Sequence, residues 1–219
     1  INACDKNKVQ LTVGYRMQHE PNTQTIINWA TAKPYGSIKN VATEAGFIVP
    51  SNSKNHWRLN KDMGGGAMYD MGVYCLNAAR YVTGLEPVSV SATQSTKRPD
   101  LFSEVDEPMQ FTLQFPQGIT ATCKTSFGET LNTLKVDCEK GWYRLKPFQS
   151  YTGVRGFTSS RARLNPFSGN QQAKQMDNDT KAIVYYQEPI VKGLEGLKDV
   201  RIIEAIYKSA AAKGSLINL

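Results

Sequence analysis

Residues 64–81 read GGGAMYDMGVYCLNAARY, and this stretch decides how the rest of the chain is interpreted. Three glycines open it and a helical run follows, which predicts a helix over 67–83 that ends at Gly84. The small or apolar side chains fall in one narrow stripe of that helix: Met68, Gly72, Cys75, Ala79 and Val82. Such a stripe favours close packing of the helix on a sheet.

The polar and aromatic side chains of the same helix fall on its opposite side. They are Asp70, Tyr74, Asn77 and Tyr81. This side is expected to face away from the sheet, toward solvent or another domain. The spacing alone favours a plain surface helix, because one acid and one tyrosine four residues apart form a common pair. A tyrosine that acts as a general acid needs a nearby cation or hydrogen bonds, since phenols titrate near pH ~10.

The remaining periodicity predicts an α+β fold: a mostly antiparallel open sheet with helices packed on one face. Alternating segments predict strands at 37–50, 87–95, 109–115, 119–127, 133–141 and 142–148, and a further short strand at 11–16. Short turns between successive strands indicate antiparallel pairing. We expect about five to seven strands between residues 38 and 160.

Helices are predicted in four further segments. Residues 1–8 resemble the tail of a helix, 19–36 contains a helix, and 173–186 and 196–214 complete the set. In the last helix the buried side is expected to consist of Val200, Ile203, Ala205 and Ile206. The helices over 67–83 and 196–213 should lie on the same face of the sheet.

Composition narrows the function classes. The chain has 219 residues and a net charge of +7, but no apolar run long enough to span a membrane. Two histidines and four cysteines without C-x-x-C spacing predict no metal site. Free buried cysteines are favoured over a Cys123–Cys138 pairing across a hairpin. Basic and aromatic residues interleave over 135–163, where a solvated sheet face is favoured over a polyanion-binding surface. No nucleic-acid or membrane partner is therefore predicted.

Three further stretches are interpreted together with GGGAMYDMGVYCLNAARYVTG: VGYRMQHEP, HWRLNKDM and GLEGLKDVRIIEAIYKSAAAKG. Together they resemble the C-terminal domain of the Gfo/Idh/MocA oxidoreductases over nearly the whole chain. Residues 70–74, DMGVY, match the tyrosine form of that family's D-x-G-x-H motif, as in the glucose–fructose oxidoreductase branch. The resemblance implies that 1–14 is a remnant of a Rossmann domain and that 15–219 is the substrate-binding and dimerisation domain.

The resemblance also implies roles for individual residues. Tyr74 would exchange a proton with a sugar hydroxyl, and Asp70 would help orient the substrate or the nicotinamide region beside it. The substrate-binding residues would be Trp57, Arg58 and Asn77, and the cofactor-binding residues would be Tyr15 and Arg16. Gly64 to Gly66 are expected to let the backbone approach a ligand or a neighbouring domain closely.

The predicted function is the substrate and dimerisation half of an NAD(P)-dependent sugar oxidoreductase. NADP or NAD would bind to a preceding Rossmann domain, whose G-x-G-x-x-G and E-K-P motifs do not occur in this sequence. This chain alone is therefore not expected to bind the cofactor tightly. Its partners would be a sugar, the Rossmann domain and a second copy paired through the sheet. The alternative is a non-catalytic binding or assembly module that uses an open sheet with the basic aromatic strip.

Overall fold

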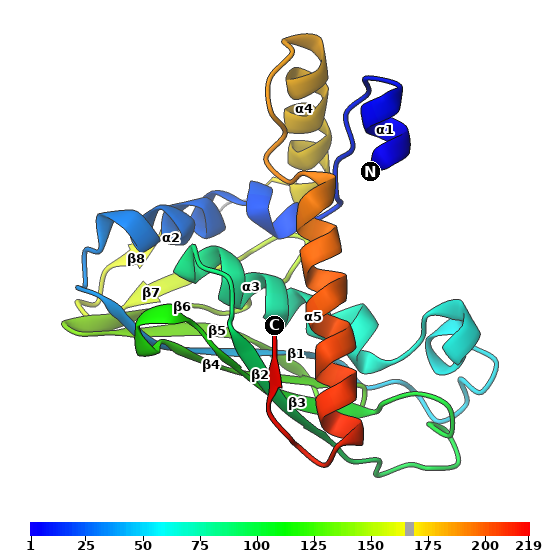
Figure 1. Ribbon diagram of the computed structural model, residues 1–219. Helices are drawn as coiled ribbons and strands as arrows, with labels where there is room; N and C mark the ends of the chain where they lie inside the picture. Colours follow the sequence, from blue (N-terminus) through cyan, green and yellow to red (C-terminus); the bar gives the residue numbers. More distant parts are fainter. Residues whose placement is uncertain (165–168) are drawn as a thin grey trace.

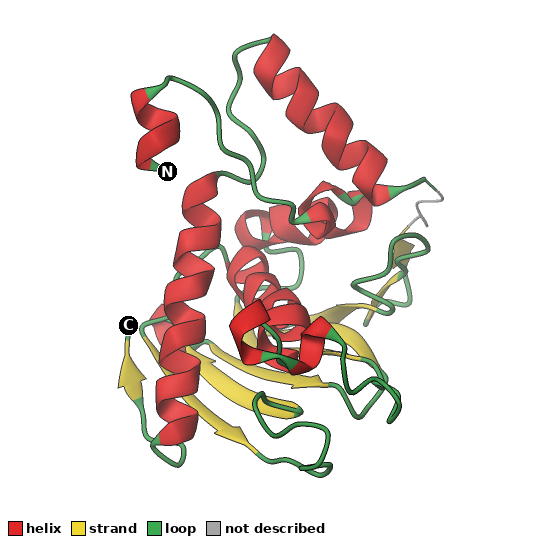
Figure 2. Ribbon diagram, turned by 90° about the vertical axis from the view of Figure 1, so that its right-hand side faces the viewer, coloured by secondary structure: helices red, strands yellow, loops and turns green. Residues whose placement is uncertain are grey.

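The computed structural model describes residues 1–164 and 169–219. One sheet carries helices on a single face, as Figures 1 and 2 show from two sides. In the described part the sheet has nine strands in the order β8-β7-β6-β5-β1-β4-β3-β2-β9. The strands are β1 Ile38–Gly46, β2 Ser89–Gln94, β3 Pro108–Gln114, β4 Thr120–Ser126, β5 Leu131–Cys138, β6 Gly141–Leu145, β7 Gly156–Thr158, β8 Arg163–Leu164 and β9 Ile217–Asn218. The predicted α+β class is confirmed.

The longer helices are α1 Asn2–Lys6, α2 Pro21–Ala32, α3 Val73–Thr83, α4 Gln171–Val184 and α5 Gly193–Ala211. Both α3 and α5 lie on the same face of the sheet (Figure 1), as predicted. Helix α3 packs on the central strands, and α5 packs on β2. Helices α1 and α4 project away from the sheet, on the side of the molecule where the N-terminus lies.

Seven strands, β1 to β7, lie between residues 38 and 160, as expected, whereas β8 and β9 extend the sheet beyond that range and one pairing differs from the prediction. The three strands β7, β8 and β9 span only two or three residues each, which is too short for a recognisable alternation. In addition, β1 pairs in parallel with β4, while the other named pairs are antiparallel. Strand β1 is separated from β4 by α3 and two strands, and this long crossover permits the parallel pairing.

Two local predictions were wrong. Residues 11–16 form no strand: Thr12 makes one isolated bridge to Lys192, because no strand of the described chain lies beside it to complete a ladder. Val200 is 46% exposed, whereas the buried side of α5 consists of Asp199, Ile202, Ile203, Ala205, Ile206 and Ser209. The periodicity of α5 was correct, but its stripe is rotated by about one residue position.

The helix that carries Asp70 and Tyr74 begins as a π-helix. Met68–Gly72 is π-helical, α3 follows directly, and Gly84 caps its end in the left-handed conformation. The predicted sheet-facing stripe is buried, and a Cβ on Gly72 would overlap the Met68 sulfur. Single π-turns inside α-helices are frequent at functional sites.

The opposite side of α3 is not simply solvated. Helix α2 packs against α3 (Figure 1), and Asn77, which bonds with Gln18 and Asp199, is only 5% exposed. The residues at the start of α2 explain why the helix begins there. Glu20 caps its first turn by accepting from the Thr23 amide, and Pro21 occupies the first helical position.

Two of the three glycines before the helix permit close packing within this chain. A Cβ on Gly65 would overlap the Arg58 carbonyl, and one on Gly66 would overlap the Asp106 carboxylate. Gly64 adopts φ +74° with no heavy atom within 4 Å of its Cβ position. The expected close approach is therefore observed at Gly65 and Gly66, but toward Arg58 and Asp106.

We expect Gly66→Ala to lower the free energy of unfolding by about 2–3 kcal/mol, because a side chain there is strained at φ +110° and displaces Asp106. Gly64→Ala is the matched control and should cost about 1 kcal/mol, since it is strained but unobstructed. Urea denaturation measures both. Equal losses would show that the contact with Asp106 contributes nothing.

The sheet face without helices is polar. Arg144 on this face lies over the rings of Trp142 and Phe157, at 5.5 and 5.2 Å from their centroids. Tyr143 and Phe148 are instead buried in the core. The basic aromatic strip is thus divided between the open face and the core.

All four cysteines are free thiols, as predicted, but only Cys75 and Cys123 are buried, while Cys4 and Cys138 are partly exposed. Among the described residues no group of three metal-binding side chains gathers, and no helix there is long and apolar enough to cross a bilayer.

Candidate functional site

A pocket of about 160 Å³ lies on the side of α3 that faces away from the sheet. Its lining residues come from two segments: Gly14, Tyr15 and Met17 before α2, and Asp70, Val73, Tyr74, Asn77 and Tyr81 on the π-turn and α3. Four of the residues predicted from the sequence therefore meet in one cavity. The remaining three, Arg16, Trp57 and Arg58, lie around them.

Tyr74 carries the most accessible reactive group of the pocket, its phenolic hydroxyl. Its ring is half-buried, and the Arg16 guanidinium lies 5.4 Å from the ring centroid. Its hydroxyl makes no hydrogen bond with the part of the chain that the structure describes. The phenol is therefore free to bond with a ligand.

Asp70 is held by Arg58. The Arg58 Nε donates to Asp70 Oδ2 at 2.7 Å, and Oδ1 has no hydrogen-bond partner among the described residues. The Arg58 guanidinium in turn lies 4.6 Å from the ring centroid of Trp57 and 5.3 Å from that of Phe47. Arg58 is thus oriented by two aromatic rings and fixes one edge of the carboxylate.

Arg16 has a different environment from that expected of a cofactor ligand. It is 5% exposed, and its terminal nitrogens donate to Gln171 Oε1 at 2.6 Å and to the carbonyls of Ser150 and Gln149. Its guanidinium also lies 4.2 Å from the ring centroid of Tyr151. These contacts leave Arg16 beside Tyr74 but turned into the protein.

Tyr15 and Asn77 belong to a buried polar network. The Asn77 amide donates to Asp199 Oδ2 at 3.0 Å and accepts from Gln18 at 2.9 Å, and the Tyr15 hydroxyl also bonds with Asp199. Burial and the neighbouring Asp199 raise the pKa of Tyr15 well above its ordinary value. Tyr15 therefore stays protonated, and it presents its ring to the pocket while its hydroxyl is occupied.

Arg80 is the cation of that network, and sequence reasoning missed it. It is 4% exposed and donates to Asp199 at 2.6 Å, to Glu195 at 2.7 Å and to Glu86 at 2.8 Å. Burial opposes its charge, but these carboxylates outweigh burial and raise the pKa of Arg80. Arg80 and Asp199 are 119 positions apart in the chain, so no local pattern indicates their pairing.

Tyr81 lies on the polar and aromatic side of the helix, as the sequence predicts, but the sequence assigns it no functional role. Its hydroxyl is buried without a hydrogen-bond partner among the described residues. Burial, with the nearby Glu20 carboxylate, raises the pKa of Tyr81 well above its ordinary value. Tyr81 therefore contributes a neutral, protonated phenol at the inner end of the pocket.

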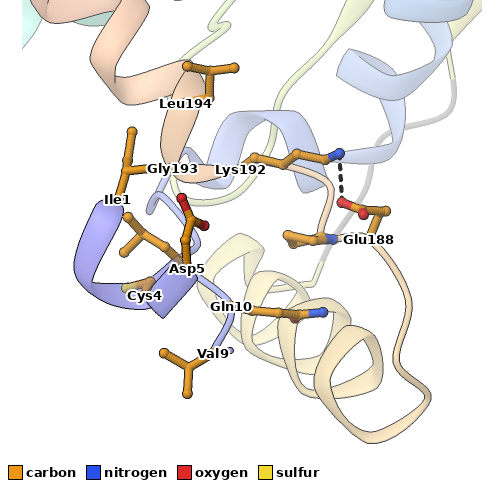
Figure 3. Close-up of a pocket in the computed structure, with 11 residues that line it drawn as sticks. Ile1, Cys4, Asp5, Val9, Gln10, Glu188, Lys192, Gly193 and Leu194 are labelled. Atoms are coloured by element: carbon orange, nitrogen blue, oxygen red, sulfur yellow. Dashed lines mark ion pairs between the residues drawn. The ribbon is translucent and has the colours of Figure 1, made fainter. Parts of the chain in front are cut away.

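A larger cavity lies elsewhere and contains none of the predicted site residues. Figure 3 shows this pocket of about 290 Å³ between the first eleven residues and the segment 188–194. The Lys192 ammonium and the Glu188 carboxylate form an ion pair of 2.6 Å at its edge. Its lining includes six of the fourteen residues that the sequence analysis assigned to a preceding domain.

The comparison with protein families identifies the class. Residues 23–144 match the family described as the GFO/IDH/MocA C-terminal domain, and this range is more than half of the chain. The chain therefore belongs to the Gfo/Idh/MocA family, as its motifs indicated.

Individual relatives agree with this assignment. The chain is 25% identical over 226 residues to a D-xylose 1-dehydrogenase [NADP(+)] of Haloarcula marismortui, covering 99% of this chain and 62% of the relative. An aldose-aldose oxidoreductase from Caulobacter crescentus, crystallised with glycerol, is 37% identical with a TM-score of 0.93, covering 100% of this chain and 66% of that one. The chain thus spans less than two thirds of the length of these relatives.

A more distant structure shares the fold alone. An oxidoreductase from Agrobacterium radiobacter in complex with NAD+, L-tartaric acid and magnesium is 16% identical, with a TM-score of 0.77 over 99% of this chain and 67% of that one. The open-sheet architecture is therefore retained where little sequence identity remains.

Proposed function

We propose that this chain is the substrate-binding domain of an NAD(P)-dependent sugar oxidoreductase, with the pocket around Tyr74 as its sugar site. The observation that supports this most directly is the meeting of Tyr15, Asp70, Tyr74 and Asn77 in one cavity. The D-xylose 1-dehydrogenase and the aldose-aldose oxidoreductase among the relatives favour an aldose as the substrate class.

The chemistry assigned to the pocket follows from its unsatisfied groups. As the phenolate, Tyr74 takes the proton of the sugar hydroxyl that is oxidised, and as the neutral phenol it returns that proton to the sugar oxygen in the reverse direction. Asp70 Oδ1 accepts a hydrogen bond from a neighbouring sugar hydroxyl, while Arg58 holds the other carboxylate oxygen. Trp57 is 38% exposed beside Arg58 and offers a flat ring to the apolar face of the sugar.

The residues of this chain suit only the reacting end of a nicotinamide cofactor. NAD(P), when bound, supplies the hydride acceptor. Tyr15 lines the pocket and can pack against such a ring, whereas the terminal nitrogens of Arg16 already bond to Gln171, Ser150 and Gln149. At about 160 Å³ the pocket is also smaller than ligand sites of about 300–1,000 Å³, which supports a site completed by another domain.

The division at residue 14 belongs to the same proposal. Residues 1–14 would be the end of the cofactor domain, and 15–219 the substrate domain. The polar open face of the sheet would pair two copies, because no helix of the described chain covers it. A monomer in sedimentation equilibrium of the full-length protein would contradict that pairing.

The test compares two proteins. Calorimetric titration of the 219-residue chain with NADP+ and NAD+ should give no micromolar binding, because it has no glycine-rich pyrophosphate site. The same chain joined to its upstream sequence should bind one cofactor and reduce it with an aldose such as D-xylose. Micromolar binding by the short chain would contradict the domain boundaries, and inactivity of the longer protein toward all aldoses would contradict the function.

A further inference from the structure

A second groove lies at the opposite side of the helix start from the Tyr74 pocket. Its volume is about 440 Å³, within the range of about 300–1,000 Å³ usual for small-molecule sites. Four segments form it: the turn that contains Lys61, the stretch from Gly65 to Tyr69 at the start of the π-helix, the end of β2 with the loop that leads to β3, and the C-terminal half of α5. It shares no lining residue with the Tyr74 pocket.

The floor of the groove is a fixed aromatic platform. Tyr69 is 42% exposed, and its ring lies against that of Tyr207 with centroids 5.5 Å apart at 33°. The Tyr207 hydroxyl donates to Asp106 Oδ1 at 2.6 Å, and the Met68 amide donates to Asp106 Oδ2 at 2.8 Å. Asp106 is only 5% exposed, so its carboxylate belongs to the wall of the groove. Its two hydrogen bonds fix Tyr207 and Met68 relative to each other.

The polar groups around the platform are mostly neutral and available. Gln94, Thr96 and Ser103 line the groove, are exposed, and have side chains without hydrogen-bond partners in the described residues. The charged side chains of Lys61 and Glu104 complete the rim. The backbone amide of Lys61 donates to the Glu104 carboxylate at 3.2 Å, and this bond joins the two loops. The groove has no cluster of positive charge that would select a phosphate.

We propose that this groove is a binding site for a neutral polyhydroxylated ligand, a monosaccharide or polyol, stacked on Tyr69. An aromatic face matches the C–H face of such a ligand, while amide and hydroxyl groups match its hydroxyls. An apolar ligand would leave Gln94, Thr96 and Ser103 without partners. The site is separate from the pocket proposed for catalysis, and its occupancy does not depend on the proposed reaction.

The experiment is a titration of the isotopically labelled chain with D-glucose, followed by backbone amide NMR. Saturable shifts are expected at amides lining the groove, such as those of Gly65, Gln94 and Val105. Tyr69→Ala should weaken this binding at least about tenfold, whereas Tyr69→Phe, which keeps the ring, should bind nearly as well. Tyr186→Ala is the matched control, because Tyr186 is 95% exposed and lies after α4, outside the groove.

The same titration also contains the outcomes that overturn the proposal. Shifts confined to Asp70, Tyr74 and Asn77 would assign sugar binding to the other pocket only. If Tyr69→Ala bound D-glucose with unchanged affinity, while the Met68 and Tyr207 amides kept their chemical shifts, Tyr69 would not be a platform for the ligand. Stronger shifts of the groove amides with inorganic phosphate than with D-glucose would show an anion site. If Tyr69→Ala fails to fold, Ser103→Ala combined with Gln94→Ala provides the second variant, with the same expected loss.

Discussion

Tyr74→Phe is expected to lower turnover at least about 100-fold in the full-length protein, while leaving cofactor affinity little changed. The substitution keeps the ring beside Arg16 and removes only the hydroxyl, which makes no hydrogen bond within the described chain. General acid–base catalysis is typically worth about 10²–10⁴ in rate, so losing the proton-transfer group should appear in kcat. Stopped-flow or steady-state measurement of NADPH formation with an aldose gives the value.

Tyr81→Phe is the matched control for that experiment. It removes a hydroxyl from the same pocket, but one that is buried without a partner. We expect less than about a tenfold change in turnover, because no proton is assigned to that phenol. If Tyr74→Phe behaved like Tyr81→Phe, Tyr74 would have no role in proton transfer, and the stripe would be only a surface for contact between domains.

The fold was predictable from the sequence wherever a segment was long enough to show its period. The alternation in β1 and β3–β5, and the stripe from Met68 to Val82, gave the correct elements and the correct buried side. The strand at 11–16 was wrong because a strand needs a neighbour, and the described chain offers only one bridge at Thr12. Likewise, the parallel pairing of β1 with β4 depends on a crossover whose path no local pattern specifies.

The candidate site was predictable in its residues but not in its connections. The motif at 70–74 indicated Asp70 and Tyr74, and the structure places both in one pocket. No local pattern indicated that Arg58 pairs with Asp70, since their contact depends on the turns that Gly65 and Gly66 permit. Long-range partners such as Arg80 and Asp199 become visible only once α3 and α5 are packed together.

Asp199→Ala is expected to lower the free energy of unfolding by about 3 kcal/mol or more. Asp199 is fully buried and accepts from Arg80, Asn77 and Tyr15. Removing the carboxylate leaves three buried donors short of an acceptor, and an uncompensated buried group typically costs about 1–3 kcal/mol. Urea denaturation with an unchanged m-value is the appropriate measurement.

Glu86→Gln distinguishes the buried partner of Arg80 from an exposed one. Glu86 also pairs with Arg80, at 2.8 Å, but its side chain is 51% exposed, so water can replace the lost interaction. Its substitution should cost less than about 1 kcal/mol. Since Asn77 and Tyr15 line the pocket, Asp199→Ala should also make the lining of the Tyr74 pocket less rigid. The contrary result is a loss of unfolding free energy for Asp199→Ala that is no larger than the loss for Glu86→Gln. It would mean that Glu86 and Glu195 alone suffice to hold Arg80. Helices α3 and α5 would then be joined by apolar packing rather than by this network.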